Sequence, residues 1–216
     1  MNKRSGFTLA EVLITLAIIG TVAAMTIPTL MTNTNKMEFK TGFKKILSTT
    51  NQAVTMSVAL NYVDFADTTT TNTDPTTSIL GILIGRMHVT KTINGDADTA
   101  AERMFGKSNV AANYTVFFAD GMVLSFPKVS SNCKVTEAGR GNICKAIVDV
   151  NGTRAPNQLS HCMGTQLRDQ STDANSVNSK GCSPTNAAIY DQFSVFLADQ
   201  QVQPNGQCAK YVLFEN

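Results

Sequence analysis

The sequence predicts an α+β protein in which one long N-terminal helix packs against an antiparallel sheet of three or four strands. Three observations lead to this fold class. An apolar segment covers residues 7–27, a pattern with helical spacing continues to about residue 60, and Asp120-Gly121 separates two runs rich in β-branched and aromatic residues. A helix followed by several strands is typical of a layered α+β arrangement.

The net positive charge of the chain comes from its first six residues. Of the 216 residues, 16% are charged and 43% are hydrophobic, which excludes collagen-like chains and highly charged disordered chains. The formal net charge is +2, and without Lys3 and Arg4 the 18 basic residues fall to 16, equal to the acidic ones. The remaining cations are scattered, so we expect no nucleic-acid partner.

The apolar segment is long enough to cross a membrane. Residues 7–27 carry Glu11 as their only charge, and a helix of this length measures about 31 Å, which matches the hydrocarbon core of a bilayer. Lys3 and Arg4 precede it, so the positive-inside rule places the N-terminus in the cytoplasm. A cleaved signal peptide, with a faint site at 22–24, and a plain membrane anchor are the alternatives. Neither alternative explains a costly acidic group in the span.

Residues 5–14, SGFTLAEVLI, resemble the cleavage and methylation signature of type IV pilins and type II secretion pseudopilins. The resemblance implies that a prepilin peptidase cuts after Gly6 and that the new N-terminal residue, Phe7, is N-methylated. It also implies a leader at 1–6, a transmembrane and assembly helix at 7–28, and an amphipathic helix with a pilin-like globular domain at 29–216. Gly20 and Pro28 lie where many members of this family carry helix-weakening residues.

Glu11 has a physical role in such a protein. Cleavage after Gly6 creates an amine on Phe7, about one and a half helical turns away. At an effective dielectric constant of about 20 and a separation of about 4 Å, the ion pair gains about 4 kcal/mol before desolvation. The resemblance implies that the pair forms between neighbouring subunits and sets their register. The alternative is an acidic residue tolerated near the helix start.

The resemblance also implies partners and a location. The partners are prepilin peptidase, other pilin or pseudopilin subunits and an inner-membrane assembly platform. The precursor is then a single-pass protein of the bacterial inner membrane, its globular domain is periplasmic or extracellular, and the mature chain joins a filament.

The second part of the long helix is amphipathic. Pro28 lacks an amide hydrogen, so we expect a kink or break near Ile27. Beyond it, apolar residues recur on one face to about Leu60, and lysines occupy the other faces as a solvated surface. The apolar positions are Phe39, Phe43, Ile46, Leu47, Val54 and Val58, and the lysines are Lys36, Lys40, Lys44 and Lys45.

The remaining elements follow from turn signals and apolar runs. Residues 61–78 read as a polar surface loop, and 79–87 and 99–105 as short helices. A hairpin is expected with strands at 114–119 and 122–126 around Asp120-Gly121. Residues 143–150 are a third strand ending at Asn151-Gly152, and 190–198 and 208–214 are each a strand or a short helix.

Five cysteines, all in the C-terminal part, indicate export to an oxidising compartment. Their spacing favours the pairs Cys133–Cys144 and Cys162–Cys182, each closing a short loop, with Cys208 left over. Because connectivity does not follow from spacing, any of the five could be the unpaired residue.

The evidence for metal sites or catalysis is limited. Asp149 and Asn151 begin a D-x-N-G-x-x-x-P-N stretch that resembles one in some pseudopilin-like proteins, and they are calcium candidates. No bidentate Glu follows, so a plain turn is favoured. His161-Cys162 lacks the spacing of a zinc site, and no catalytic motif is present. The sequence therefore predicts a structural subunit and not an enzyme, and the alternative is a minor or tip pilin with a ligand-binding C-terminal domain.

Overall fold

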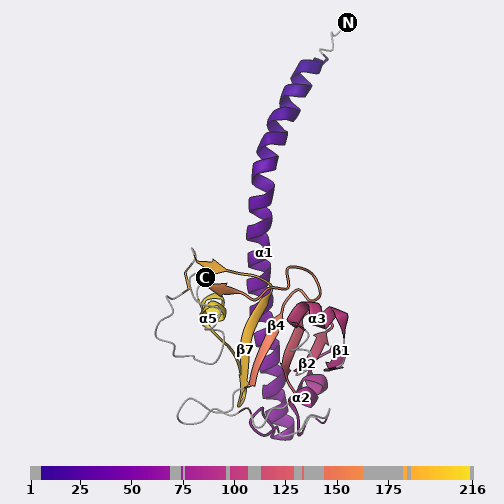
Figure 1. Cartoon of the computed structure of the whole chain (residues 1–216), viewed down its shortest axis with the longest axis vertical. Helices are drawn as coiled ribbons and strands as arrows, with labels where there is room; N and C mark the ends of the chain where they lie inside the picture. Colours follow the sequence, from indigo (N-terminus) through magenta and orange to yellow (C-terminus); the bar gives the residue numbers. More distant parts are fainter. Residues whose placement is uncertain are drawn as a thin grey trace. The chain divides into compact units, whose positions relative to one another are not determined.

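The computed structural model describes residues 6–68, 74, 76–95, 98–106, 113–128, 133, 144–162, 182–183 and 186–214. The chain divides into two compact units, Met1–Glu38 and Phe39–Asn216. The first unit holds the apolar part of one helix. The described residues of the second unit form the rest of that helix, a six-stranded antiparallel sheet and three short helices (Figure 1). The predicted α+β fold class is confirmed.

Helix α1 runs from Leu9 to Asn61 without interruption, and Pro28 lies inside it. The expectation was a kink or a break near Ile27, and of these two the break is wrong. Proline removes one amide donor, and threonine hydroxyls donate to carbonyl oxygens on both sides of it. Thr26 Oγ1 donates to Val22 O at 3.0 Å and Thr32 Oγ1 donates to Pro28 O at 2.9 Å.

The C-terminal half of α1 buries one face, as its periodicity predicts. Phe43 is fully buried and stacks on Phe193 with a centroid distance of 4.3 Å. Val58 is only half-buried, while two small polar residues and an alanine complete the buried face. The buried residues of α1 are Phe39, Phe43, Ile46, Leu47, Thr50, Ala53, Val54 and Ser57.

Lysines on this helix contact other elements of the globular unit. Lys45 Nζ lies 2.9 Å from Asp120 Oδ2, and the Lys40 ammonium lies 5.5 Å from the centroid of the Tyr211 ring. Lys36 and Lys44 are exposed. The predicted solvated surface therefore includes an ion pair that ties α1 to the β-hairpin.

The main sheet has six strands and not the three or four predicted. Its spatial order is β1-β2-β3-β4-β7-β8, and each neighbouring pair is antiparallel. The strands are β1 Val89–Asn94, β2 Asn113–Phe118, β3 Val123–Pro127, β4 Cys144–Asp149, β7 Gln192–Ala198 and β8 Gln201–Pro204. Strands β5 His161–Cys162 and β6 Ala187–Ala188 form a separate two-stranded ladder.

The strands that sequence analysis missed are short or lie at the edges of the sheet. Strand β1 reads VTKTIN and buries one of its six side chains, Ile93. Strand β8 has four residues, of which Val202 and Pro204 are buried. An edge strand packs against fewer neighbours, so its composition stays polar and lacks the apolar run that marks a central strand.

Helices cover both faces of the sheet. Successive strand residues point to opposite faces, so Leu124 packs in the core with α1 whereas Val123 joins a smaller cluster on the other face with Phe105. Helix α3, Thr99–Phe105, supplies that second cluster. Helices α2, Ile79–Arg86, and α5, Gln207–Phe214, contribute to the main core.

The short helices begin where the sequence places capping residues. Ser78 accepts a hydrogen bond from the Gly81 amide at the start of α2, and Asp98 accepts two backbone amides at the start of α3. Both helices confirm the prediction. Residues 207–214, for which strand and helix were both open, form the helix α5.

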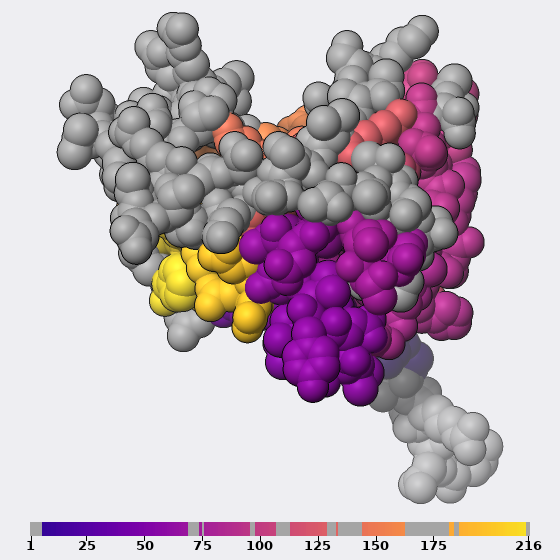
Figure 2. All heavy atoms as spheres, turned by 90° about the horizontal axis from the view of Figure 1, so that it is seen from below, coloured from indigo at the N-terminus to yellow at the C-terminus, as the bar shows by residue number. Residues whose placement is uncertain are grey.

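The end of α1 reaches the surface of the globular unit. Figure 2 shows it in purple, together with the segment that follows, between the yellow C-terminal residues and the magenta strands and helices. Met56, Leu60 and Tyr62 are exposed there.

The predicted hairpin is confirmed, and its turn contacts a second turn. Strand β2 pairs with β3 so that Tyr114 lies opposite Phe126, and Gly121 in the turn has a φ of 87°. Gly152, after β4, has a φ of 72°, and a Cβ atom added there would lie 2.5 Å from the Gly121 carbonyl oxygen. Glycine is required at 152 both for its backbone angle and for this close approach.

We expect Gly152→Ala to destabilise the globular unit much more than Gly121→Ala. Both residues have positive φ, which costs an alanine about 1–2 kcal/mol, but an added Cβ at 121 meets nothing within 4 Å. The clash at 152 adds to the backbone strain, so its total cost should exceed about 3 kcal/mol. Urea unfolding of the full chain in detergent measures both, and equal losses of stability would contradict the close approach.

Candidate functional site

The start of α1 is closed by a capping box. Thr8 precedes the first helical residue and accepts the Glu11 amide at 3.3 Å. In return, Glu11 Oε2 accepts the Thr8 amide and the Thr8 hydroxyl, each at 2.8 Å. A Thr followed three residues later by Glu is the signature of this arrangement. The pattern is visible in the sequence, but sequence analysis attributed no capping role to Glu11.

The first part of α1 exposes an apolar surface on all sides. Side chains such as Leu9, at 80% exposure, and Ile19, at 64%, are left largely uncovered by the described residues. Exposing such a contiguous apolar surface to water is unfavourable, so the segment requires lipid or other helices around it. Among the described residues, α1 is the one helix long and apolar enough to cross a membrane.

The predicted cleavage site lies just outside the helix. Gly6 and Phe7 precede the first residue of α1 and are exposed, so their peptide bond is not protected by helical hydrogen bonds. Gly20 lies within the helix, and an added Cβ there would meet nothing within 4 Å. Lys3, Arg4 and the rest of the leader before Gly6 lie outside the described residues.

This N-terminus defines a class of protein. Residues 1–27 match the family model of the prokaryotic N-terminal methylation motif, the signature of type IV pilins and pseudopilins. The chain therefore carries the N-terminal segment of a pilin-like or pseudopilin-like precursor, which points to a structural subunit rather than an enzyme. Comparison with curated proteins and with solved structures gives no match. The segment also fits a precursor that is anchored in a membrane.

Two cysteine pairs of the globular unit lie at disulfide distance. Cys133 joins Cys144 with a Cα–Cα distance of 5.3 Å, and Cys162 joins Cys182 with one of 5.4 Å. These are the pairs that spacing favours, and Cys208 is the buried free cysteine. Cys208 also lies beside the second disulfide, which spacing does not reveal.

The calcium candidates Asp149 and Asn151 lie at the end of β4 and in the turn that follows. Asp149 is fully buried and accepts hydrogen bonds from Gln192 Nε2 at 3.0 Å and from the Asn151 amide at 3.2 Å. Burial, and to a smaller extent the nearby Asp191 carboxylate, raises the pKa of Asp149 to about 7. Both of its carboxylate oxygens thus have protein donors, which agrees with the plain turn that we favoured. Calcium binding there stays a prediction.

Asp191 binds two backbone amides of a distant segment, a role that sequence analysis did not predict. Its two carboxylate oxygens accept the Asn157 amide at 2.7 Å and the Gln158 amide at 2.8 Å. Ser160 continues this contact, because its amide donates to Gln192 O and its hydroxyl donates to Tyr190 O. Polar contacts therefore join segments 157–160 and 190–192. They hold the chain in place immediately before β5, which begins at His161.

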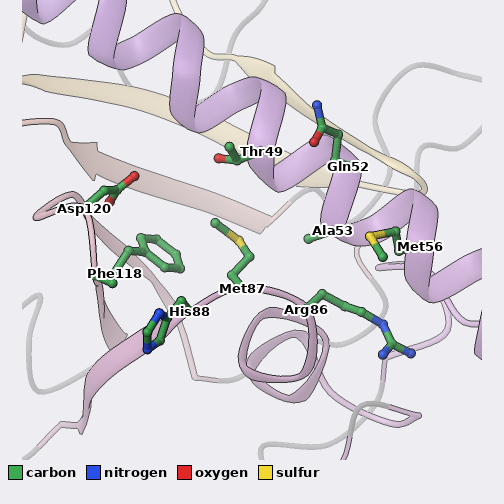
Figure 3. A pocket seen from close by; sticks show the side chains of 10 residues that line it. Thr49, Gln52, Ala53, Met56, Arg86, Met87, His88, Phe118 and Asp120 are labelled. Carbon is green, nitrogen blue, oxygen red and sulfur yellow. The ribbon is translucent and has the colours of Figure 1, made fainter.

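A cavity of about 300 Å³ lies between α1, the α2–β1 connection and the β-hairpin (Figure 3). Its lining combines apolar side chains, such as Met87 and Phe118, with polar ones, and Asp120 among the latter is the partner of Lys45. The lining residues are Thr49, Gln52, Ala53, Met56, Arg86, Met87, His88, Phe118, Ala119 and Asp120.

We expect the globular unit to lose stability as pH rises, through Asp149. Its folded pKa of about 7 lies above the ordinary value of 3.8 for an aspartate, so the folded chain keeps a proton that the unfolded chain releases above about pH 4. The contribution is present below that pH and is lost by about pH 7, with a slope of up to about 1.4 kcal/mol per pH unit.

Asp149→Asn isolates this effect, because the amide keeps the side chain's size and removes its titration. The difference in the free energy of unfolding between the two proteins, followed by urea titration across this pH range, should narrow toward low pH. A difference that does not depend on pH would show that Asp149 is ionised in the fold. Repeating the titration with added calcium tests the ion, since binding to an ionised Asp149 would reverse the loss of stability in the wild type alone.

Proposed function

We propose that the chain is a structural subunit of a type IV pilus or a type II secretion pseudopilus, polymerised through α1. The observation that carries the proposal is the methylation motif on a helix whose apolar side chains are exposed on all sides. That helix continues into a folded unit by way of its amphipathic half. A plain anchor would need the apolar span but not the motif.

Processing by prepilin peptidase is the first step of this function. The enzyme would cut after Gly6 and methylate the amine of Phe7. The position of both residues outside α1 supports this, since a protease binds its substrate in an extended form that a helix would have to unwind to adopt. Cleavage also removes Lys3 and Arg4, whose role is then limited to orienting the precursor.

Assembly then depends on Glu11. Both bonds from Thr8 end on Oε2, so Oε1 takes no part in the capping box. The carboxylate can therefore keep its capping role and still accept the methylated amine of a neighbouring subunit through the second oxygen. In an apolar bundle such a contact fixes the axial position of one helix against the next, because either ion alone would be buried without a partner.

The remaining assignments follow the same proposal. The precursor is placed in the bacterial inner membrane with its globular unit on the periplasmic or extracellular side, where the two disulfides are stable. Its partners are prepilin peptidase, other subunits of the filament and the inner-membrane assembly platform. We expect no contact with nucleic acid.

A minor or tip subunit with a ligand-binding globular unit is the second candidate. The cavity beside α1 favours it, because a lining of apolar side chains with a few polar ones is typical of small-ligand sites. Copy number separates the candidates. A major subunit dominates purified filaments, whereas a tip subunit is present once or a few times in each.

The processing step predicts a mature chain that begins at a methylated Phe7. Co-expression with a prepilin peptidase, followed by mass spectrometry of the intact protein, measures this directly. Gly6→Val is the control, because a bulky side chain at the cut should leave the precursor whole. A wild-type chain that still begins at Met1 after co-expression with the peptidase would contradict the proposal.

The assembly step predicts that Glu11→Gln and Glu11→Val insert into the membrane but enter filaments at least tenfold less than the wild type. Glutamine can keep the capping bonds to Thr8 and loses only the charge, which is worth about 4 kcal/mol in the ion pair before desolvation. Thr15→Val, a polar to apolar change one turn further along the same helix, is the matched control. Normal assembly of Glu11→Gln would show that the helix cap, and not the charge, is what matters.

A further inference from the structure

Three sulfur atoms meet in the globular unit. The Sγ atoms of Cys162, Cys182 and Cys208 all lie within 4.8 Å of one another. Two of them form a disulfide, so the third is a thiol directly beside a bond that it can attack. Among the described residues, these three cysteines are the one group whose side chains could act together in this way.

Separate elements bring the three sulfurs together. Cys208 belongs to α5 and Cys162 to β5, and the polar contacts of segments 157–160 with 190–192 set where β5 begins. Cys162 and Cys208 are buried, whereas Cys182 is half-buried. The site is therefore built from the fold and does not result from a chance contact of loose chain ends.

We propose that this cluster is a thiol–disulfide exchange site, in which the free thiol moves between Cys208 and Cys182. The Cys208 thiolate attacks Cys162 Sγ, the Cys162–Cys182 bond breaks, and a Cys162–Cys208 disulfide forms. The electron pair of the broken bond leaves on Cys182, which takes up the proton that Cys208 released. The number of disulfides is unchanged, so the step needs no oxidant or reductant.

The direction of attack follows from burial. A thiolate leaves more readily when its own pKa is low, and the half-buried Cys182 is better solvated than the buried Cys162. Attack on Cys162 with Cys182 as the leaving group is therefore preferred over the reverse. After the exchange the free thiol is that of the half-buried Cys182 and no longer that of the buried Cys208. A low-molecular-weight disulfide or a maleimide can modify it there.

The surroundings make the exchange slow and dependent on pH. Burial raises the pKa of the Cys208 thiol to about 11, and the Lys40 ammonium opposes this. Other titratable groups on the same elements are Lys210 and Tyr211 of α5 and His161 of β5. Because the thiolate is the attacking form, the rate of exchange should rise about tenfold per pH unit below that pKa.

The test is to find the thiol after incubation of the full chain in detergent. Samples are held at about pH 7 and at about pH 9, trapped with N-ethylmaleimide under acid denaturation, and mapped by mass spectrometry without reduction. The expected result is label on both Cys208 and Cys182, with label on Cys182 appearing about 100-fold faster at the higher pH. Label on Cys208 alone at every time and pH would overturn the proposal.

Two variants and one internal control complete the experiment. Cys208→Ala should abolish all label, and Cys182→Ser in a glutathione redox buffer should form the Cys162–Cys208 disulfide. Two free thiols in Cys182→Ser would count against the site. Cys133 and Cys144 must stay unlabelled, because label there as well would mean that the cysteines exchange through unfolded chains. Since none of these steps requires cleavage or a filament, failure of the exchange and failure of the proposed function are separate results.

Discussion

The globular unit depends on the burial of one face of α1 against the sheet. Phe43 lies at the centre of this contact, fully buried and stacked on Phe193 of β7, and Ile46 and Val54 extend it along the helix. No other described element presents so long an apolar face to the sheet, since α2 and α5 have eight residues each. The helix that carries the methylation motif is thus also the main support of the core. A substitution in its C-terminal half would disturb folding first and any assembly only as a consequence.

The parts of the fold that can be predicted are those set by local rules. A helical repeat of apolar residues from Phe39 to Val54, an Asp-Gly turn and capping residues before α2 and α3 each act over a few positions, and each is read from the chain directly. The edge strands β1 and β8 cannot be predicted in this way, because their pairing partners, and not their own composition, hold them in place. Strands β5 and β6 have two residues each, which is too short for any periodicity.

The candidate functional residues also fall into those that a local motif predicts and those that only the tertiary structure places. Gly6, Phe7 and Glu11 are recognised from a motif of consecutive residues, whereas the burial of Asp149 and the position of Cys208 depend on tertiary contacts. Cys208 is 26 positions beyond Cys182 and 46 beyond Cys162, and spacing alone cannot place it beside them. Pro28 shows the opposite error, because a strong local rule predicted a kink or a break, and the helix continues through the proline without a break.

The disulfide between Cys162 and Cys182 has a consequence for the segment that it encloses. The two Cα atoms are held 5.4 Å apart, and Asp191 ties down the chain just before β5. Cys162 and Cys182, the residues on either side of the intervening segment, are therefore held at a fixed separation by the bond and by the contacts of the globular unit. Doubling the length of a closed loop costs only about 0.6 kcal/mol in closure entropy. The separation of these two cysteines is thus set by the disulfide and depends little on the number of residues between them.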